Sequence, residues 1–438
     1  MFLTKRLYIL LAIACALCAA GAAVPLLFEV GKVFLWLIVI AFVIDCTLLW
    51  RYKKGITARR TMAERFSNGD DNEVDLRIES SYPYSIKLSV IDEIPVEFQD
   101  RNMSFALSLQ RKEGKNIIYK LRPTERGSYK FGLIRVFVRT VLGLVERRYS
   151  LGSETDVKVY PSYLMLHRYE LLAISDRLTD LGIKRIRRIG NNTDFSQIRD
   201  YVVGDDYRSI NWKATARRHQ LMVNVFQQER SQQVFNVIDK GRVMRQSWRG
   251  MTLLDYSINA SLVLSYVAMS KEDKAGLLTF CDGVETSLPA SRQGGQMQSI
   301  LEALYKEKAT FGESDFSALV DYVNRHITRR SLLILYTSFF DKTSLERQLP
   351  YLRQLDRRHR LLVVFFEDRE LREFVERKPE TNEEFYQQTI ARKYAAEQRL
   401  IVSELRQNGI TALLTLPENL SVNVINKYLE MKARNMLG

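Results

Sequence analysis

The chain has 438 residues, of which 46% are hydrophobic and 26% are charged, and its few glycines (21) and prolines (9) exclude collagen-like and low-complexity proteins. Its formal net charge of +14 favours an anionic neighbour, either nucleic acid or an acidic lipid surface. The four cysteines form no CxxC pair with zinc-site partners and indicate no disulfide framework, which favours a reducing compartment.

Two apolar stretches come first in the chain. Residues 7–28 carry no charge, and residues 33–50 carry one, that of Asp45. Each stretch is long enough to cross a bilayer as a helix, so residues 1–56 are predicted to form a transmembrane hairpin with its turn at residues 29–32. The flanking basic residues then place both ends of the hairpin in the cytoplasm; they are Lys5, Arg6, Arg51, Lys53, Lys54, Arg59 and Arg60.

Two alternatives stay open for this region. Lys5, Arg6, the first apolar run and the small residues 19–23 also resemble a cleaved signal peptide. Asp45 lies five residues before Trp50, so its carboxylate is expected to reach the inner interface, although a functional role inside the membrane is the alternative.

A β domain is predicted over residues 57–165, because from about residue 72 to residue 161 apolar and polar side chains alternate, with turn-like breaks between the runs. This period of two predicts about seven short strands in an antiparallel β-sandwich-like domain. No cluster of residues here resembles a catalytic site, so the domain is expected to be structural or to bind a partner.

A basic connector is predicted at residues 166–230. It begins with a short helix at residues 169–181, followed by a basic run that is either a solvated face or a contact with anionic lipid or another polyanion. The lipid-facing candidates in this run are Lys184, Arg185, Arg187 and Arg188.

The most distinctive stretch of the chain follows, at residues 194–217. Gly204, Asp205 and Asp206 are a strong turn signal, and neighbouring arginines can pair with the two carboxylates. Trp212 offers a large apolar anchor. Paired carboxylates can act as acid and base or bind a metal, but adjacent aspartates among arginines favour a structural ion-pair network.

This stretch resembles the signature of the bacterial family known as domain of unknown function 58. The matching residues, expected to dock a partner, are Asp194, Phe195, Arg199, Tyr201, Gly204, Asp205, Asp206, Arg208, Asn211, Trp212 and Arg217. The resemblance implies a two-span anchor in the bacterial inner membrane, a β region, and a C-terminal von Willebrand factor A-like domain. Thr140 and Val141 depart from the family pattern, which often has Asp-Pro there.

From residue 231 onward, apolar runs alternate with segments of helical spacing. Strands are predicted at residues 234–239, 275–280, 332–337, 360–366 and 411–416, and helices at 253–269, 297–305, 345–355, 383–407 and 420–431. The alternation predicts a doubly wound α/β domain over residues 231–438 with a largely parallel sheet. Ligand sites in such sheets lie at the carboxyl ends of strands, which directs attention to Asp239.

In a von Willebrand factor A-like domain, a working magnesium site at this position has the pattern Asp-x-Ser-x-Ser. Here Asp239 stands first, but Gly241 and Val243 replace both serines, and Lys240 and Arg242 add positive charge. In a later loop, Ser338 stands where an Asp is expected, although Asp341 could substitute in part. We therefore expect a degenerate metal site and no resident cofactor, with Mg²⁺ as the alternative.

Other catalytic signatures are absent from the sequence. It contains no P-loop, no His-Glu-x-x-His and no Gly-x-Ser-x-Gly. The four histidines are scattered, each beside an arginine, and are expected at the surface; they are His167, His219, His326 and His359.

The sequence thus favours a non-enzymatic, membrane-tethered scaffold or adaptor for protein–protein interaction. The resemblance implies a MoxR-type AAA+ ATPase as the partner, in assembly, chaperone-like, envelope or stress functions. One alternative is a metal-assisted hydrolase that uses Asp194, Asp205, Asp206 or Asp239. The other is nucleic-acid binding through the basic connector.

Overall fold

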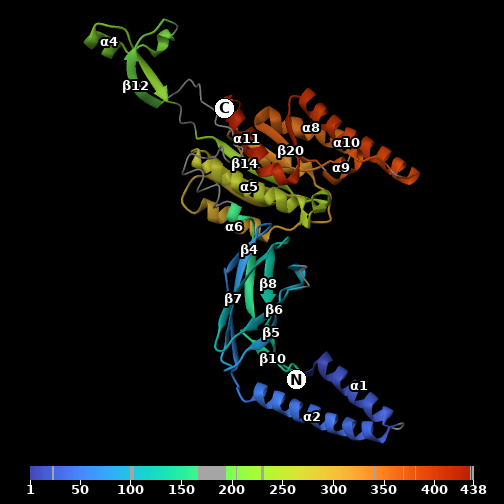
Figure 1. Cartoon of the computed structure of the whole chain (residues 1–438). Helices are drawn as coiled ribbons and strands as arrows, with labels where there is room; N and C mark the ends of the chain where they lie inside the picture. The colour runs from blue at the N-terminus through green and yellow to red at the C-terminus, as the bar shows by residue number, and fades with distance from the viewer. Residues whose placement is uncertain are drawn as a thin grey trace. The chain divides into compact units, whose positions relative to one another are not determined.

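The computed structural model (Figure 1) describes residues 1–21, 24–98, 103–165, 194–203, 205–227, 231–339, 341–367, 369–379, 381–434 and 436. The chain divides into two compact units, Met1–Tyr160 and Pro161–Gly438. The apolar helices and the β region, which the sequence predicts as separate parts, both belong to the first unit.

The first unit begins with two helices, α1 (Lys5–Ala20) and α2 (Pro25–Trp50). The predicted turn at residues 29–32 is wrong, because Glu29 and Lys32 form an ion pair within α2. The helix break comes earlier because Pro25, with its fixed φ and missing N–H, occupies the first position of α2. Within the described residues, one helical segment, Leu26–Trp50, is long and apolar enough to cross a membrane.

The β region of the first unit contains three sheets, with strand orders β1-β10-β9-β5-β6, β2-β4-β7 and β3-β11-β8. The strands are β1 (Phe2–Leu3), β2 (Ile56–Met62), β3 (Arg65–Ser67), β4 (Asn72–Ser80), β5 (Ile86–Asp92), β6 (Ser104–Leu109), β7 (Gly114–Leu121), β8 (Gly127–Phe131), β9 (Ile134–Arg139), β10 (Val145–Leu151) and β11 (Thr155–Tyr160). A short 3₁₀ turn, Val96–Phe98, follows β5. Neighbouring strands run antiparallel except β3 and β11.

The period-two alternation of the sequence is borne out in these strands. In β4, the side chains of Val74, Leu76 and Ile78 are buried, and they join one hydrophobic core with residues of the other sheets. The described part of the region holds ten strands, from β2 to β11, rather than about seven, and two of them, β2 and β3, precede residue 72, where the predicted alternation begins.

Two charged residues near the helices lie elsewhere than the sequence suggests. Asp45 does not extend toward water but is fully buried, with its carboxylate bonded to the segment between β9 and β10. Arg60 does not flank the membrane span, because it is buried in β2 with its guanidinium 3.1 Å from the Asp92 carboxylate.

The second unit contains a small module within the predicted connector. It consists of β12 (Asp194–Asp200), a 3₁₀ turn (Tyr207–Ser209), α4 (Trp212–Arg218) and β13 (Met222–Gln227), and β12 pairs antiparallel with β13. The stretch is thus a folded β-hairpin with an inserted helix. The predicted helix at residues 169–181 and the basic residues Lys184, Arg185, Arg187 and Arg188 lie outside the described residues.

The rest of the second unit is a mixed, mostly parallel α/β domain with the strand order β18-β17-β14-β19-β20-β21. The strands are β14 (Gln233–Asp239), β17 (Lys274–Phe280), β18 (Val284–Ser291), β19 (Leu332–Tyr336), β20 (Arg360–Phe366) and β21 (Thr411–Thr415), and the tiny hairpin β15 (Ser247–Trp248) and β16 (Met251–Thr252) precedes the first helix. The helices are α5 (Leu253–Ser270), α6 (Gln296–Lys306), α7 (Phe316–His326), α8 (Lys342–Arg358), α9 (Arg369–Glu376), α10 (Asn382–Gln407) and α11 (Leu420–Ala433).

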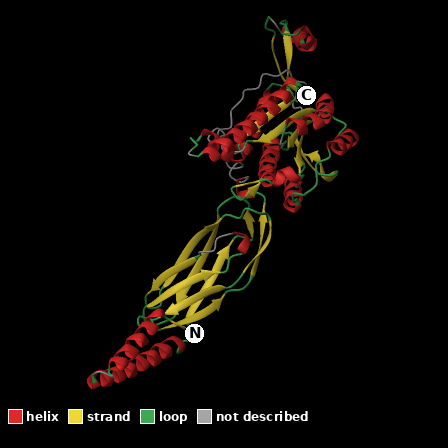
Figure 2. Ribbon diagram, turned by 90° about the vertical axis from the view of Figure 1, so that its right-hand side faces the viewer, coloured by secondary structure: helices red, strands yellow, loops and turns green. Residues whose placement is uncertain are grey.

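Helices cover both faces of this sheet (Figure 2). Alternate residues of β14 point to opposite faces: Val234 and Ile238 join the core formed with α5, α6 and α11, whereas Phe235 and Val237 join the core formed with α7, α8 and α10. The strand order reverses at β14, which pairs with β17 on one side and with β19 on the other. A crevice is expected where β14 and β19 end, and Asp239 lies at that place.

Candidate functional site

The signature module is held together by an ion pair between two of its signature residues. Nη2 of Arg199 lies 2.6 Å from Oδ1 of Asp205, and Oδ2 of Asp205 accepts a hydrogen bond from the backbone N–H of Val202 (2.9 Å). The guanidinium of Arg199, with the help of this N–H, lowers the pKa of the Asp205 carboxyl. Asp205 therefore stabilises the turn that connects β12 to the rest of the module.

Two further signature residues cap the short helices of the module. Asp206 accepts a hydrogen bond from the backbone N–H of Arg208 (3.0 Å) at the start of the 3₁₀ turn. Asn211 accepts one from the N–H of Ala214 (3.0 Å) at the start of α4, and its amide donates to Asn224 in β13 (2.7 Å). Such caps satisfy N–H groups that have no partner within the helix.

Several side chains of the module face outward, among them that of the signature residue Trp212. Trp212 and Tyr207 are each 69% exposed, and Val203 is 96% exposed. The basic side chains of Arg208 and Arg217 are exposed as well. Isolated exposed apolar residues are common, but Val203, Tyr207 and Trp212 lie within ten positions of one another along the chain.

The remaining signature residues are described only in part. The backbone N–H of Tyr201 donates to the carbonyl of Leu221 (2.8 Å), which helps to close the hairpin. Asp194 and Phe195 lie in β12, but their side chains are outside the described residues, as is the whole of Gly204. Within the described part, the signature divides into framework residues and exposed residues.

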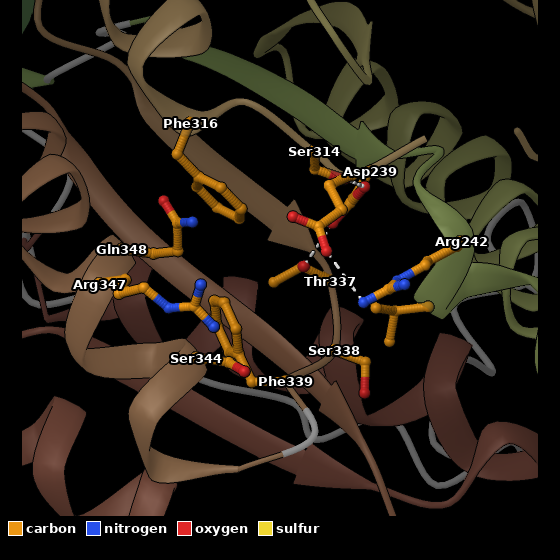
Figure 3. A pocket seen from close by; sticks show the side chains of 12 residues that line it. Asp239, Arg242, Ser314, Phe316, Thr337, Ser338, Phe339, Ser344, Arg347 and Gln348 are labelled. Carbon is orange, nitrogen blue, oxygen red and sulfur yellow. Dashed lines mark hydrogen bonds and ion pairs between the residues drawn. The ribbon is translucent and has the colours of Figure 1, made fainter. Parts of the chain in front are cut away.

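Asp239, the last residue of β14, is the centre of the second candidate site. Its buried Oδ1 accepts hydrogen bonds from the N–H of Gly241 (2.8 Å) and from the hydroxyl of Ser314 (Figure 3). Its Oδ2 accepts one from the hydroxyl of Thr337 (2.6 Å). Burial raises the pKa of Asp239, and these three donors oppose the rise.

Ser314 is the residue of this site that sequence reasoning missed. It lies in the loop before α7, 75 residues from Asp239, within a turn-like run of glycine, serine and acidic residues. A Cβ added at Gly241 would lie 2.2 Å from Oγ of Ser314. The hydroxyl of Ser314 thus fills the space that a serine side chain at position 241 would need.

The charged residues beside Asp239 are paired with other groups. Nζ of Lys240 is buried, 2.6 Å from a Glu307 carboxylate oxygen and 2.5 Å from one of Glu285. Lys240 therefore does not add charge to the candidate cation site, contrary to the expectation from sequence. Arg242 lines a cavity of about 110 Å³ beside Asp239 and lies 2.9 Å from Glu313.

The residues at this edge do not fit a magnesium ion. Val243 and Ser338 line the cavity without a carboxylate. Asp341 instead caps α8, where it accepts a hydrogen bond from the N–H of Ser344 (2.7 Å). In the described part of the chain, no three His, Cys, Asp or Glu side chains gather to hold a metal. Both oxygens of the buried Asp239 carboxylate already accept hydrogen bonds. Because Mg²⁺ prefers several oxygen ligands, a single carboxylate of this kind matches it poorly.

Comparison with known proteins settles the family. A family model described as "Protein of unknown function DUF58" matches residues 197–394, from β12 into α10. Over these residues the chain belongs to the DUF58 family. The DUF58 match therefore includes both the signature module and most of the α/β domain.

A curated relative of this DUF58 chain is "Uncharacterized protein YeaD" of Bacillus subtilis (strain 168), with 26% identity over 217 residues. The match covers 47% of this chain and 54% of the relative, so it spans about half the length of each.

Two solved structures are similar to parts of the chain. The conserved hypothetical protein BatB from Bacteroides thetaiotaomicron matches with a TM-score of 0.32 and 12% identity, over 46% of this chain and 99% of BatB. The CARDB domain of PF1109 from Pyrococcus furiosus matches with a TM-score of 0.19 and 19% identity, over 24% of this chain and 93% of that domain. At these TM-scores the likenesses carry no further argument.

Proposed function

We propose that this protein is a non-enzymatic scaffold, tethered to the bacterial inner membrane, that uses its signature module to dock a partner protein. The proposal rests on one observation: some signature residues stabilise the module, whereas others are exposed on its surface. Arg199, Asp205 and Asn211 build the module, whereas Trp212 stands exposed on it. Tyr207, which lies between the signature residues Asp206 and Arg208, is exposed as well.

The tether is the hairpin of α1 and α2, with the β region on the cytoplasmic side. Large apolar side chains of α2, such as Trp36, Leu37 and Ile40, are exposed, as suits a helix surrounded by lipid. Polar bonds join the ends of both helices to the β region, including that of Asp45, which supports a retained anchor over a cleaved signal peptide. The basic residues Lys5 and Arg51 at these ends suit the cytoplasmic face.

The partner should present an acidic surface with an apolar pocket. Trp212 begins α4, and the other exposed side chains of this helix include Lys213, Arg217 and Arg218. Aromatic side chains ringed by polar ones dominate the energetics of many interfaces. The family resemblance adds a class for this partner, a MoxR-type AAA+ ATPase, with roles in assembly, chaperone-like, envelope or stress functions.

The α/β domain fits the same role. Its strand order, with one antiparallel edge strand and Asp239 at the switch point, supports a von Willebrand factor A-like domain. Its altered metal loop, in which Gly241 and Val243 stand for serines, supports binding without a cation.

Co-purification tests the proposal. Detergent-solubilised full-length protein should retain a MoxR-type ATPase, with or without nucleotide, and Trp212→Ala should lower the yield by about tenfold or more, since an aromatic anchor contributes about 2 kcal/mol or more. The matched control is Tyr386→Ala, which removes an aromatic side chain of similar exposure (70%) from α10. Equal yields from the wild type and Trp212→Ala, or no ATPase in either, would count against the proposal.

The metal-assisted hydrolase is the second candidate, and a calorimetric titration separates it from the scaffold. The donor set of Asp239, Ser314 and Thr337 predicts no micromolar binding of Mg²⁺ or Mn²⁺. Micromolar binding that is lost in Asp239→Ala would favour the hydrolase instead. For nucleic-acid binding, the corresponding sign would be a steep dependence of DNA affinity on salt.

A further inference from the structure

The segment between β9 and β10 joins α2 through the buried carboxylate of Asp45. Its Oδ2 accepts hydrogen bonds from the backbone N–H groups of Leu144 (2.8 Å) and Val145 (2.9 Å). Its Oδ1 accepts one from the hydroxyl of Thr140. Three donors surround the carboxylate, and this explains how an aspartate is accommodated in an otherwise apolar helix.

The same segment is also tied to the start of α1. The hydroxyl of Thr4 donates to the carbonyls of Gly143 (2.6 Å) and Leu144 (3.0 Å), and its N–H donates to Leu144 (3.2 Å). The strand β1 just before it pairs with β10. Hydrogen bonds therefore hold the segment 140–144 to both apolar helices, to α1 through Thr4 and to α2 through Asp45.

Asp45 lies within the apolar part of α2. Asp45 is five residues before Trp50, and a helix rises 1.5 Å per residue, so the carboxylate sits about 7 Å from the end of the helix. The tip of the segment carries two apolar side chains that point away from the protein, Val141 (70% exposed) and Leu142 (44% exposed). Gly143, with a positive φ of 64°, makes the turn that presents them.

We propose that Val141 and Leu142 form a second membrane contact, a loop that inserts into the boundary between headgroups and acyl chains beside the anchor. This inference rests on the proposed membrane anchor. A lipid bilayer is the occupant because Thr140 and Leu144, on either side of the tip, are bonded to Asp45, about 7 Å inside the end of the apolar helix α2. That distance falls within the depth of about 5–10 Å that interfacial apolar groups reach. The contact fixes the β region against the membrane surface.

Photo-crosslinking of the full-length protein in vesicles of phosphatidylethanolamine and phosphatidylglycerol tests the contact. The test variant is Leu142→p-benzoylphenylalanine. The same substitution at Val39, an exposed residue of α2, reports on the anchor itself. The negative control is Val96, which is 79% exposed and follows β5 at the end of the sheet opposite Thr140, since Asp92 pairs with Ile134.

The expected result is lipid adducts at positions 39 and 142, with roughly tenfold more adduct at 142 than at 96, as befits a side chain at the acyl boundary rather than in water. Adducts at 39 but none at 142, or protein adducts in place of lipid at 142, would overturn the loop contact while the anchor stands. No lipid adduct at 39 would overturn the anchor and the loop contact together.

Discussion

At the residue scale, Ser314 donates a hydrogen bond to Asp239 and fills the space beside Gly241. The glycine is visible in the sequence, because it lies two residues after Asp239. The contribution of Ser314 is not visible, because 75 residues separate it from Asp239 along the chain and only the fold brings the two together.

Because Oγ of Ser314 occupies the space beside Gly241, we expect positions 241 and 314 to be energetically coupled. Gly241→Ser should lower the free energy of unfolding by about 1–3 kcal/mol, because its side chain would overlap Oγ of Ser314. Adding Ser314→Ala should restore about 0.5–3 kcal/mol, since the new serine gains space and can donate to Asp239. Chemical denaturation of the two single variants and the double variant measures the coupling, and strictly additive effects would contradict it.

A second prediction at this scale concerns His359, which is expected at the surface from sequence but is fully buried at the start of β20. Burial, with the nearby charges of Arg358 and Arg330, lowers its pKa to about 4. An unfolded chain takes up this proton near pH 6.5, whereas the folded protein does not until about pH 4. Stability should therefore be lost as the pH falls through this window, by up to about 1.4 kcal/mol per unit.

Melting temperatures in detergent at pH 7 and pH 5 measure this effect. The drop between the two should be smaller in His359→Leu than in the wild type, while His326→Gln, at an exposed position, should behave as the wild type does. An equal drop in all three proteins would show that His359 does not titrate as its burial requires.

At the element scale, sequence patterns predicted the buried parallel strands and the long helices of the α/β domain well. The strand β20 begins and ends where predicted, at Arg360 and Phe366, because a parallel strand with two covered faces reads as a continuous apolar run. The edge strand β18 and the short helices α7 and α9 were missed. Only one face of β18 is even half-buried, so its apolar pattern is weak.

The signature module shows what the sequence could not supply at this scale. Its turn signal at Asp205 and Asp206 predicts a structural ion pair, and Arg199 pairs with Asp205, but β12 and β13 pair across more than twenty intervening residues, which include an inserted helix. A connector was therefore predicted where a folded hairpin stands.

The cap of α4 offers a test of whether signature residues stabilise the module. Asn211→Ala removes the cap on the N–H of Ala214 and the bond to Asn224, and should destabilise the helix by about 1 kcal/mol. Hydrogen exchange of the peptide amides in α4 should speed up about fivefold as a result. Lys213→Ala, in the same turn but outside the cap, should leave the exchange unchanged; equal acceleration in both would argue against capping by Asn211.

At the scale of the whole molecule, the apolar helices are not an appendage to the β region. Asp45 and Thr4 bond to one segment of that region, and Thr140, where the family often has Asp, provides the donor that an acidic side chain there would lack. These contacts join residues about 95 to 140 positions apart, so the apolar runs predict the helices but no local pattern predicts how the helices are attached to the β region.

In the proposed function, the exposed side chains of the signature module dock a protein partner at the membrane. The most direct measurement is photo-crosslinking in native membranes with p-benzoylphenylalanine at position 212, compared with the same group at position 386. The account predicts a discrete adduct with an AAA+ ATPase from position 212 that is absent from position 386. No protein adduct at 212, or the same adducts from both positions, would contradict it.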